Sequence, residues 1–111
     1  KNSPKDLIKI DKVESILKNT SPKGYGEAYR IFALSDKVFI NNLSEIQPPV
    51  LYLTGRKDPN STTLMSEQMS QKTPGSSSIS IRGEAHMMAY IAEDKVNPLI
   101  EQFFINSKIN T

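Results

Sequence analysis

A nearly continuous apolar segment in the middle of the chain constrains the fold most strongly. Residues Val50–Thr54 read Val-Leu-Tyr-Leu-Thr and are followed at once by Gly55. Strands that are apolar on both faces are typical of parallel sheets whose two faces are covered by helices. We therefore predict a buried strand at this position and, with it, an α/β fold that contains a parallel sheet.

A second strand follows, separated from the first by a helix rather than by a hairpin turn. The alternating segment Ser78–Arg82 predicts this strand, which ends at Gly83. Between the two strands, capping residues at positions 60–62 open a helix that runs to about residue 72, with Met65 and Met69 expected on its inner side. A connection of this kind favours two parallel strands joined by a right-handed crossover.

Parallel pairing brings the loops that follow both strands to one edge of the sheet. That edge is where open α/β folds bind ligands and place catalytic residues. Asp58 lies in the first of these loops, and His86, the single histidine of the chain, lies in the second. A carboxylate that fixes the tautomer of an imidazole and stabilises its protonated form makes a general base that works near neutral pH. Asp58 and His86 are therefore candidate catalytic residues.

Each of these loop residues also has a simpler interpretation. A single histidine in a loop is often only solvated or hydrogen-bonded to backbone. Asp58, which precedes Pro59, is equally typical of a turn or of an acid that complements a helix N-terminus. Arg56 and Lys57 lie near the same helix N-terminus, where they could bind an anion or simply be solvated.

Helical periodicity predicts two helices before the first strand. One starts near residues 4–6, carries apolar residues at helical spacing from Leu7 to Leu17, and ends at the polar residues and proline of positions 19–22. The other covers residues 25–34, where Tyr25, Tyr29 and Phe32 form an apolar stripe that we expect to pack against another surface. Residues 36–46 are expected to be irregular or a short helix.

The last predicted helix has the clearest periodicity in the chain. Its apolar positions, listed in chain order, are Val96, Leu99, Ile100, Phe103 and Phe104. Glu93 and Asp94 lie near its start, and Pro98 is expected in its first turn, where proline is tolerated.

Composition and charge limit the function classes. The 111 residues suit one domain, and 37% apolar with 23% charged residues indicate a soluble globular chain. The net charge of +2 is scattered, so no nucleic-acid or membrane partner is expected, and no apolar run approaches the roughly 20 residues of a membrane span. The absence of cysteine excludes disulfides, a thiol nucleophile and cysteine-ligated metal. We expect no cofactor and no metal.

The first residues carry a further expectation about location and processing. The segment Lys1–Lys5 has no apolar core like that of a signal peptide, so a cytoplasmic location is expected. A chain that starts at Lys1 rather than Met is expected to be processed or cut from a longer one.

The order of the two loop motifs resembles the C-terminal part of enzymes with the α/β-hydrolase fold. The specific parts are the Gly-x-x-Asp step at 55–58 and the Gly-x-x-His-Met step at 83–87, followed by the helix that contains Phe103 and Phe104. The resemblance covers about residues 46–105. It implies that residues 46–111 are the final strand-helix-strand-helix part of the hydrolase core and that residues 1–45 are a helical segment like the end of the lid.

The resemblance also implies an activity. In the family the matching aspartate is the acid of a catalytic triad and the matching histidine is the general base, which assigns these roles to Asp58 and His86. The most similar subgroup hydrolyses small esters, enol-lactones and carbon–carbon bonds, so the implied partner is a small-molecule ester or lactone. Ala85 stands where glycine is common, and Ile91 and Glu93 stand where an acid and a proline are usual. These differences affect loop shape more than chemistry.

One difference is serious. The nucleophile of the family lies on a Gly-x-Ser-x-Gly turn, and no such segment occurs in these 111 residues. The oxyanion-hole loop is also missing, and Ser61 is better explained as a helix cap than as a nucleophile. Without a nucleophile and oxyanion donors, a triad has no mechanism for acyl transfer.

Three hypotheses follow. The favoured one is a fragment of a serine-type hydrolase that holds two triad residues and is inactive alone. The second is half of an enzyme that another chain completes, and the third is a non-catalytic binding or dimerisation module. Because the strand at Val50–Thr54 would expose an unpaired edge and the helices would expose apolar faces, we also expect a homo-oligomer.

Overall fold

The computed structural model describes residues 3–109, together with the side chains of all of these except 36, 37 and 109. The chain divides into two compact units, Lys1–Ile40 and Asn41–Thr111. The fold class predicted from the sequence is confirmed, since two parallel strands with helices are preceded in the chain by further helices. The assignment of the first segment to a lid stays a prediction.

The first unit consists of two helices, α1 (Pro4–Lys18) and α2 (Pro22–Phe39). Helix α1 begins with a reciprocal capping box, in which Ser3 Oγ accepts the Asp6 N–H at 3.2 Å and the Asp6 carboxylate accepts the Ser3 N–H at 3.3 Å. Helix α2 is capped by Ser21, whose Oγ accepts the Gly24 N–H. Both helices confirm the predicted ones, although α2 continues beyond residue 34.

The predicted aromatic stripe of α2 is exposed. Tyr25 and Tyr29 stack with their ring centroids 6.5 Å apart, but they and Phe32 keep 55%, 58% and 64% of their surface accessible. Within the first unit, the described residues therefore do not cover the stripe. Helix α1, all of whose residues are described, likewise has no buried residue.

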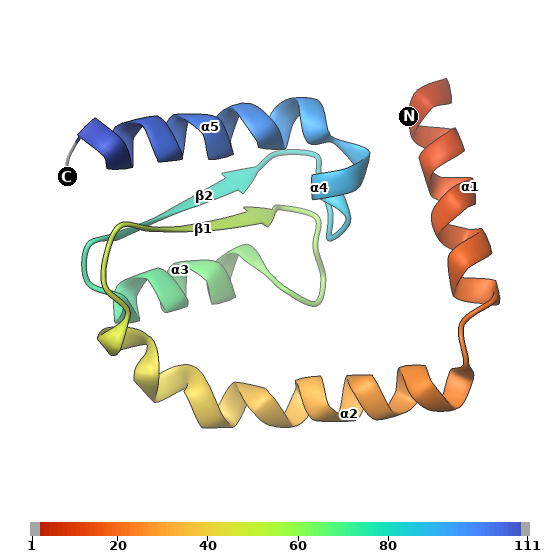
Figure 1. Cartoon of the computed structure of the whole chain (residues 1–111), viewed down its shortest axis with the longest axis horizontal. Coiled ribbons are helices and arrows are strands. Elements are labelled where there is room, and N and C mark those ends of the chain that lie inside the picture. Colours follow the sequence, from red (N-terminus) through yellow and green to blue (C-terminus); the bar gives the residue numbers. More distant parts are fainter. Residues whose placement is uncertain (1–2, 110–111) are drawn as a thin grey trace. The chain divides into compact units, whose positions relative to one another are not determined.

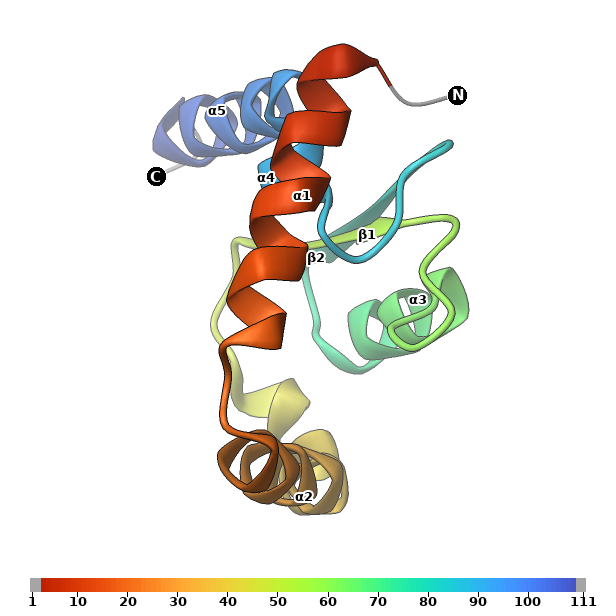
Figure 2. The same ribbon diagram turned by 90° about the vertical axis from the view of Figure 1, so that its right-hand side faces the viewer.

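The second unit contains the sheet. After the 3₁₀ helix η1 (Ile40–Glu45), the chain forms β1 (Val50–Gly55), α3 (Thr63–Lys72) and β2 (Ser76–Ile81). The two strands are parallel, with a register that runs from Val50 opposite Ser76 to Gly55 opposite Ile81. Helix α3 lies on one face of this pair and the last helix on the other (Figures 1 and 2). The predicted parallel pair with its helical crossover is confirmed.

The contact between α3 and the sheet is polar. Ser66 Oγ lies 3.3 Å from Ser78 Oγ, and Ser70 Oγ lies 2.8 Å from Ser76 Oγ. The expectation that Met65 faces inward is wrong, because Met65 is 42% accessible whereas Ser66 is 8% accessible. Ser76 and Ser78 of β2 account for this, because their half-buried hydroxyls are stabilised by hydrogen-bond partners on the facing helix.

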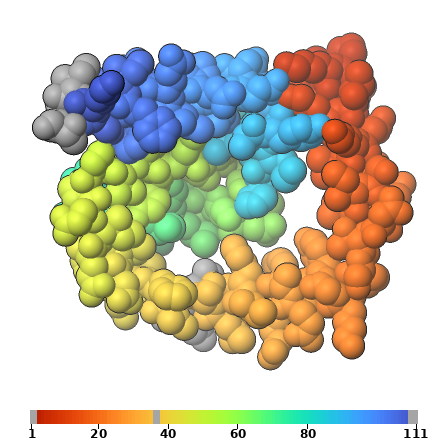
Figure 3. Space-filling model, in the orientation of Figure 1, coloured from red at the N-terminus to blue at the C-terminus, as the bar shows by residue number. Residues whose placement is uncertain are grey.

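The chain ends with the short helix α4 (Met88–Ile91) and the long helix α5 (Glu93–Ile109). Their residues form one continuous surface in the space-filling view (Figure 3). Pro98 lies inside α5 and not in its first turn as expected, because the helix already begins at Glu93. The buried Ala92 and Val96 explain the early start, since they anchor this end of the helix in the core.

The predicted apolar face of α5 is buried only at its N-terminal end. Val96 is 2% accessible, whereas Ile100 is 38% and Phe104 is 65% accessible. The short helix α4 was not predicted, since four residues are too few to show a helical period.

Candidate active site

The loop after β1 and the loop after β2 are joined through their backbones. The Arg56 N–H donates to the Ile81 carbonyl at 3.0 Å, and the Lys57 N–H donates to the Glu84 carbonyl at 2.8 Å. Gly55 permits this approach, because a Cβ atom there would lie 2.5 Å from the Glu84 carbonyl oxygen. The end of β1 and the loop after β2 therefore form one rigid corner at the carboxyl edge of the strands.

Asp58 is held by its own loop. Its Oδ1 accepts the N–H groups of Asn60 at 3.0 Å and Ser61 at 2.9 Å, so the carboxylate closes a turn in front of α3. The buried Thr54 hydroxyl donates to the Ser61 carbonyl at 3.0 Å and ties this turn back to β1. The expectation that Ser61 caps α3 is wrong, since the N-cap is Thr62, whose Oγ1 accepts the Met65 N–H.

His86 reaches Asp58 from the second loop. Gly83, with a φ of +83°, makes the left-handed step that turns the chain away from β2. Nδ1 of His86 then lies 2.6 Å from Oδ2 of Asp58. The Asp58 side chain is only 3% accessible, whereas that of His86 is 66% accessible. The structure thus brings the two predicted site residues together as a buried acid and an exposed base.

The hydrogen bonds of Asp58 keep it ionised. Burial by itself would raise the pKa of the carboxyl, but the Ser61 N–H, the His86 ring, the Asn60 N–H and the charge of His86 outweigh it and hold the pKa below the ordinary value of 3.8. Because an ionised carboxylate only accepts hydrogen bonds, Nδ1 of His86 is the donor. The other ring nitrogen, Nε2, is then the one that can accept a proton.

The basic residues of the first loop are placed differently from each other. Arg56 Nε donates to Ser80 Oγ at 3.1 Å, which directs its side chain along β2. Both residues are exposed, so the two interpretations given above for Arg56 and Lys57, anion binding and simple solvation, stay predictions.

Two interacting residues at this corner were not predicted as a pair from the sequence. Glu84 accepts a hydrogen bond from Lys95 Nζ on α5, with 3.0 Å between Nζ and Oε1. The Glu84 side chain is 15% accessible and that of Lys95 is 52% accessible. Glu84 lies in the loop after β2 and Lys95 lies on α5, so the periodicity of a single helix or strand does not connect them.

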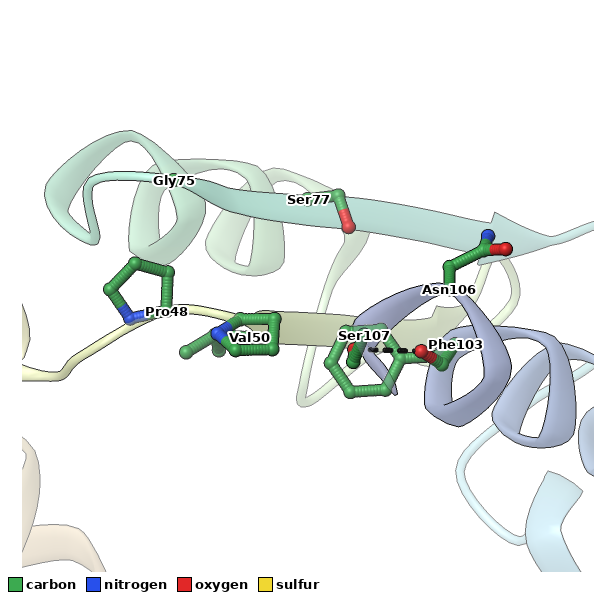
Figure 4. A pocket seen from close by; sticks show the side chains of 8 residues that line it. Pro48, Val50, Gly75, Ser77, Phe103, Asn106 and Ser107 are labelled. Carbon is green, nitrogen blue, oxygen red and sulfur yellow. Dashed lines mark hydrogen bonds between the residues drawn. The ribbon is translucent and has the colours of Figure 1, made fainter. Parts of the chain in front are cut away.

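A cavity of about 430 Å³ lies at the other end of the strands. It is lined by the start of β1, the turn before β2 and the C-terminal half of α5 (Figure 4), and the lining residues are Pro48, Pro49, Val50, Gly75, Ser77, Phe103, Asn106 and Ser107. Because Asp58 and His86 follow the carboxyl ends of the same strands, this cavity is not part of the candidate active site.

Among the described residues, neither a metal site nor a membrane-spanning helix is present. Across residues 3–109, no group of three or more His, Asp or Glu side chains is arranged so that it could hold a metal ion. In the same part of the chain, the helices are too short or too polar to cross a membrane.

Comparison with known proteins supports a relationship to hydrolases. The chain is 39% identical over 96 residues to the (E)-2-((N-methylformamido)methylene)succinate hydrolase of Acinetobacter baylyi. The match covers 86% of this chain but 36% of that enzyme, so the chain spans about a third of the length of the hydrolase it matches. No family model matches the chain. This match confirms the predicted similarity to part of a hydrolase, whereas the predicted subgroup of esterases, lactonases and carbon–carbon bond hydrolases stays a prediction.

Proposed function

We propose that this chain supplies the acid and the general base of a hydrolase, with Asp58 as the acid and His86 as the base. The observation that carries the proposal is the 2.6 Å contact between the buried carboxylate of Asp58 and Nδ1 of the exposed His86. A nucleophile and oxyanion donors would come from polypeptide outside these 111 residues, because the chain contains no Gly-x-Ser-x-Gly turn.

In this mechanism Nε2 of His86 takes the proton of a nucleophilic hydroxyl as that oxygen attacks the substrate. The imidazolium that forms is stabilised by the Asp58 carboxylate and later gives its proton to the leaving group. Two backbone N–H groups already bind Oδ1, so Oδ2 is the oxygen directed at the imidazole. The low pKa of Asp58 supports this role, because it keeps the acid ionised throughout the cycle.

We propose small molecules with an ester, a lactone or a related hydrolysable bond as the substrate class. The similar enzyme of Acinetobacter baylyi is a hydrolase of an N-formylated aminomethylene succinate, which supports a small organic substrate. Hydrolysis of a carbon–carbon bond is the remaining alternative. Assays with a panel of esters, lactones and substrates with a hydrolysable carbon–carbon bond distinguish the three activities.

A chimera tests the catalytic proposal. The matching part of the Acinetobacter baylyi enzyme is replaced by the corresponding residues of this chain, and hydrolysis of that enzyme's own substrate and of p-nitrophenyl acetate is measured. We expect turnover, with kcat lowered about 10²–10⁴-fold by His86→Ala or by Asp58→Asn, in the range that general acid–base catalysis contributes.

Asp94→Asn is the matched control, because it removes an exposed acid from α5 without touching the candidate site. It is expected to leave turnover unchanged. A chimera that folds with native circular dichroism but hydrolyses neither substrate contradicts the proposal, and so does one whose turnover survives His86→Ala.

A second proposal concerns self-association. The exposed stripe Tyr25, Tyr29 and Phe32 supports a role for α2 in dimerisation, since apolar patches of this kind are rare on monomers. We expect sedimentation equilibrium to show a dimer that Phe32→Glu dissociates. A concentration-independent monomer contradicts this proposal without affecting the catalytic one.

A further inference from the structure

Glu84 occupies the point where the two loops and helix α5 meet. Its carbonyl oxygen accepts the Lys57 N–H at 2.8 Å, one residue before Asp58. Its side chain accepts Lys95 Nζ at 3.0 Å. His86 follows two residues later in the same loop. Glu84 therefore links the loop of the acid, the loop of the base and the buried N-terminal end of α5.

The His86 ring has few other supports. Its side chain is 66% accessible, so packing does not hold it, and its one hydrogen bond among the described residues is to Asp58. An exposed ring stays on a buried carboxylate only if the backbone that carries it is fixed. The ion pair between Glu84 and Lys95 ties that backbone to α5, and the contacts of Gly55 and Lys57 with Glu84 tie it to the loop that carries Asp58.

We propose that the Glu84–Lys95 ion pair is a positioning device that holds His86 against Asp58, and this inference rests on the proposed function. Lys95 is anchored next to Val96, which is 2% accessible, so its helix backbone is a firm support. The Glu84 carboxylate is largely shielded from solvent, at 15% accessible, so its interaction is less screened than that of a surface pair. The pair acts on the base through the backbone and does not touch a substrate.

The single histidine makes the inference directly measurable. In the 111-residue chain labelled with ¹⁵N-histidine, the Nδ1–H proton that is bonded to Asp58 is observed by NMR and its exchange with water is timed. Lys95→Met removes the ammonium and keeps the stem, and it is expected to speed this exchange about fivefold, the factor that corresponds to a favourable partly exposed ion pair. Glu84→Gln is expected to act in the same direction, and Lys95→Arg is expected to stay near wild type.

Glu27→Gln is the matched control, because it breaks another ion pair, Glu27 with Arg30 at 3.6 Å on α2. It is expected to leave the Nδ1–H exchange unchanged. Unchanged exchange in Lys95→Met overturns the inference. An increase that is matched by an equal increase at the Val96 amide also overturns it, because the effect is then general destabilisation. Neither result involves hydrolysis, so failure of this inference can be distinguished from failure of the proposed catalytic function, which the chimera tests.

Discussion

The substitution Gly55→Ala tests how closely the two loops must approach. A Cβ atom at this position would lie 2.5 Å from the carbonyl oxygen of Glu84, 2.7 Å from its carbonyl carbon and 2.8 Å from the carbonyl oxygen of Ala85. All three are backbone atoms, so no flexible side chain can move aside. Gly55 is not among the glycines with positive φ, which means that alanine suits its backbone and that the cost comes from the contact alone.

The size of the effect follows from the contacts that must be lost. To make room, the loop after β2 has to move away from β1, which breaks the hydrogen bond from the Lys57 N–H to Glu84 and weakens the one from the Arg56 N–H to Ile81 at the end of β2. Each such bond contributes about 1 kcal/mol net, and overpacking a tight contact costs about 1–3 kcal/mol where part of the strain relaxes. Because the movement relieves the clash as it breaks the bonds, we expect a loss of about 2–4 kcal/mol in the free energy of unfolding.

Amide hydrogen exchange is the appropriate assay, because it reports on this corner rather than on the whole chain. Gly55→Ala is expected to speed exchange of the Arg56 and Lys57 amides and to remove the bonded Nδ1–H signal of His86. The control is Gly26→Ala, which has no atom within 4 Å of its Cβ position and should stabilise α2 by about 1 kcal/mol at most. Protected Arg56 and Lys57 amides in Gly55→Ala would refute the close-approach argument.

Further predictions concern the acid, a cap and a buried hydroxyl pair. The folded pKa of Asp58 lies below 3.8, so its contribution to the free energy of unfolding is complete well above that pH and is lost as the pH falls through 3.8 and below. In an acid titration monitored by circular dichroism, Asp58→Asn should therefore lose less stability than the wild type. Thr62→Ala removes the acceptor of the Met65 N–H and should cost about 1 kcal/mol in urea unfolding, whereas Thr62→Ser should cost little. Tyr52→Phe removes the 2.6 Å contact with the buried Thr73 hydroxyl and should also cost about 1 kcal/mol, and an unchanged urea midpoint would contradict that contact.

The sequence was sufficient for the two strands, the longer helices and their order, but not for the short helix α4 or for which helix faces are buried. The apolar run at Val50–Thr54 and the helix-length connection were enough to predict a parallel pair, because few arrangements satisfy both. Of the two methionines predicted on the inner side of α3, Met69 is half-buried but Met65 is exposed and Ser66 is buried in its place, against the usual preference of methionine for the interior. Which face of α3 is buried depends on the serines of β2 opposite it, and that pairing is a property of two segments together.

The two candidate site residues also differ in how far the sequence alone predicts their positions. The orientation of Asp58 is local, since the N–H groups that hold Oδ1 lie two and three residues away, and an aspartate before a proline and capping residues suggests such a turn. The position of His86 is not local, because it depends on the fit of Glu84 over Gly55 and on the tie to Lys95. In this chain the Gly-x-x-Asp step therefore orients Asp58 almost by itself, whereas the Gly-x-x-His step places His86 only because other residues hold that loop. For this reason the residues that decide whether the pair forms are Gly55, Glu84 and Lys95, none of which has a chemical role in the proposed reaction.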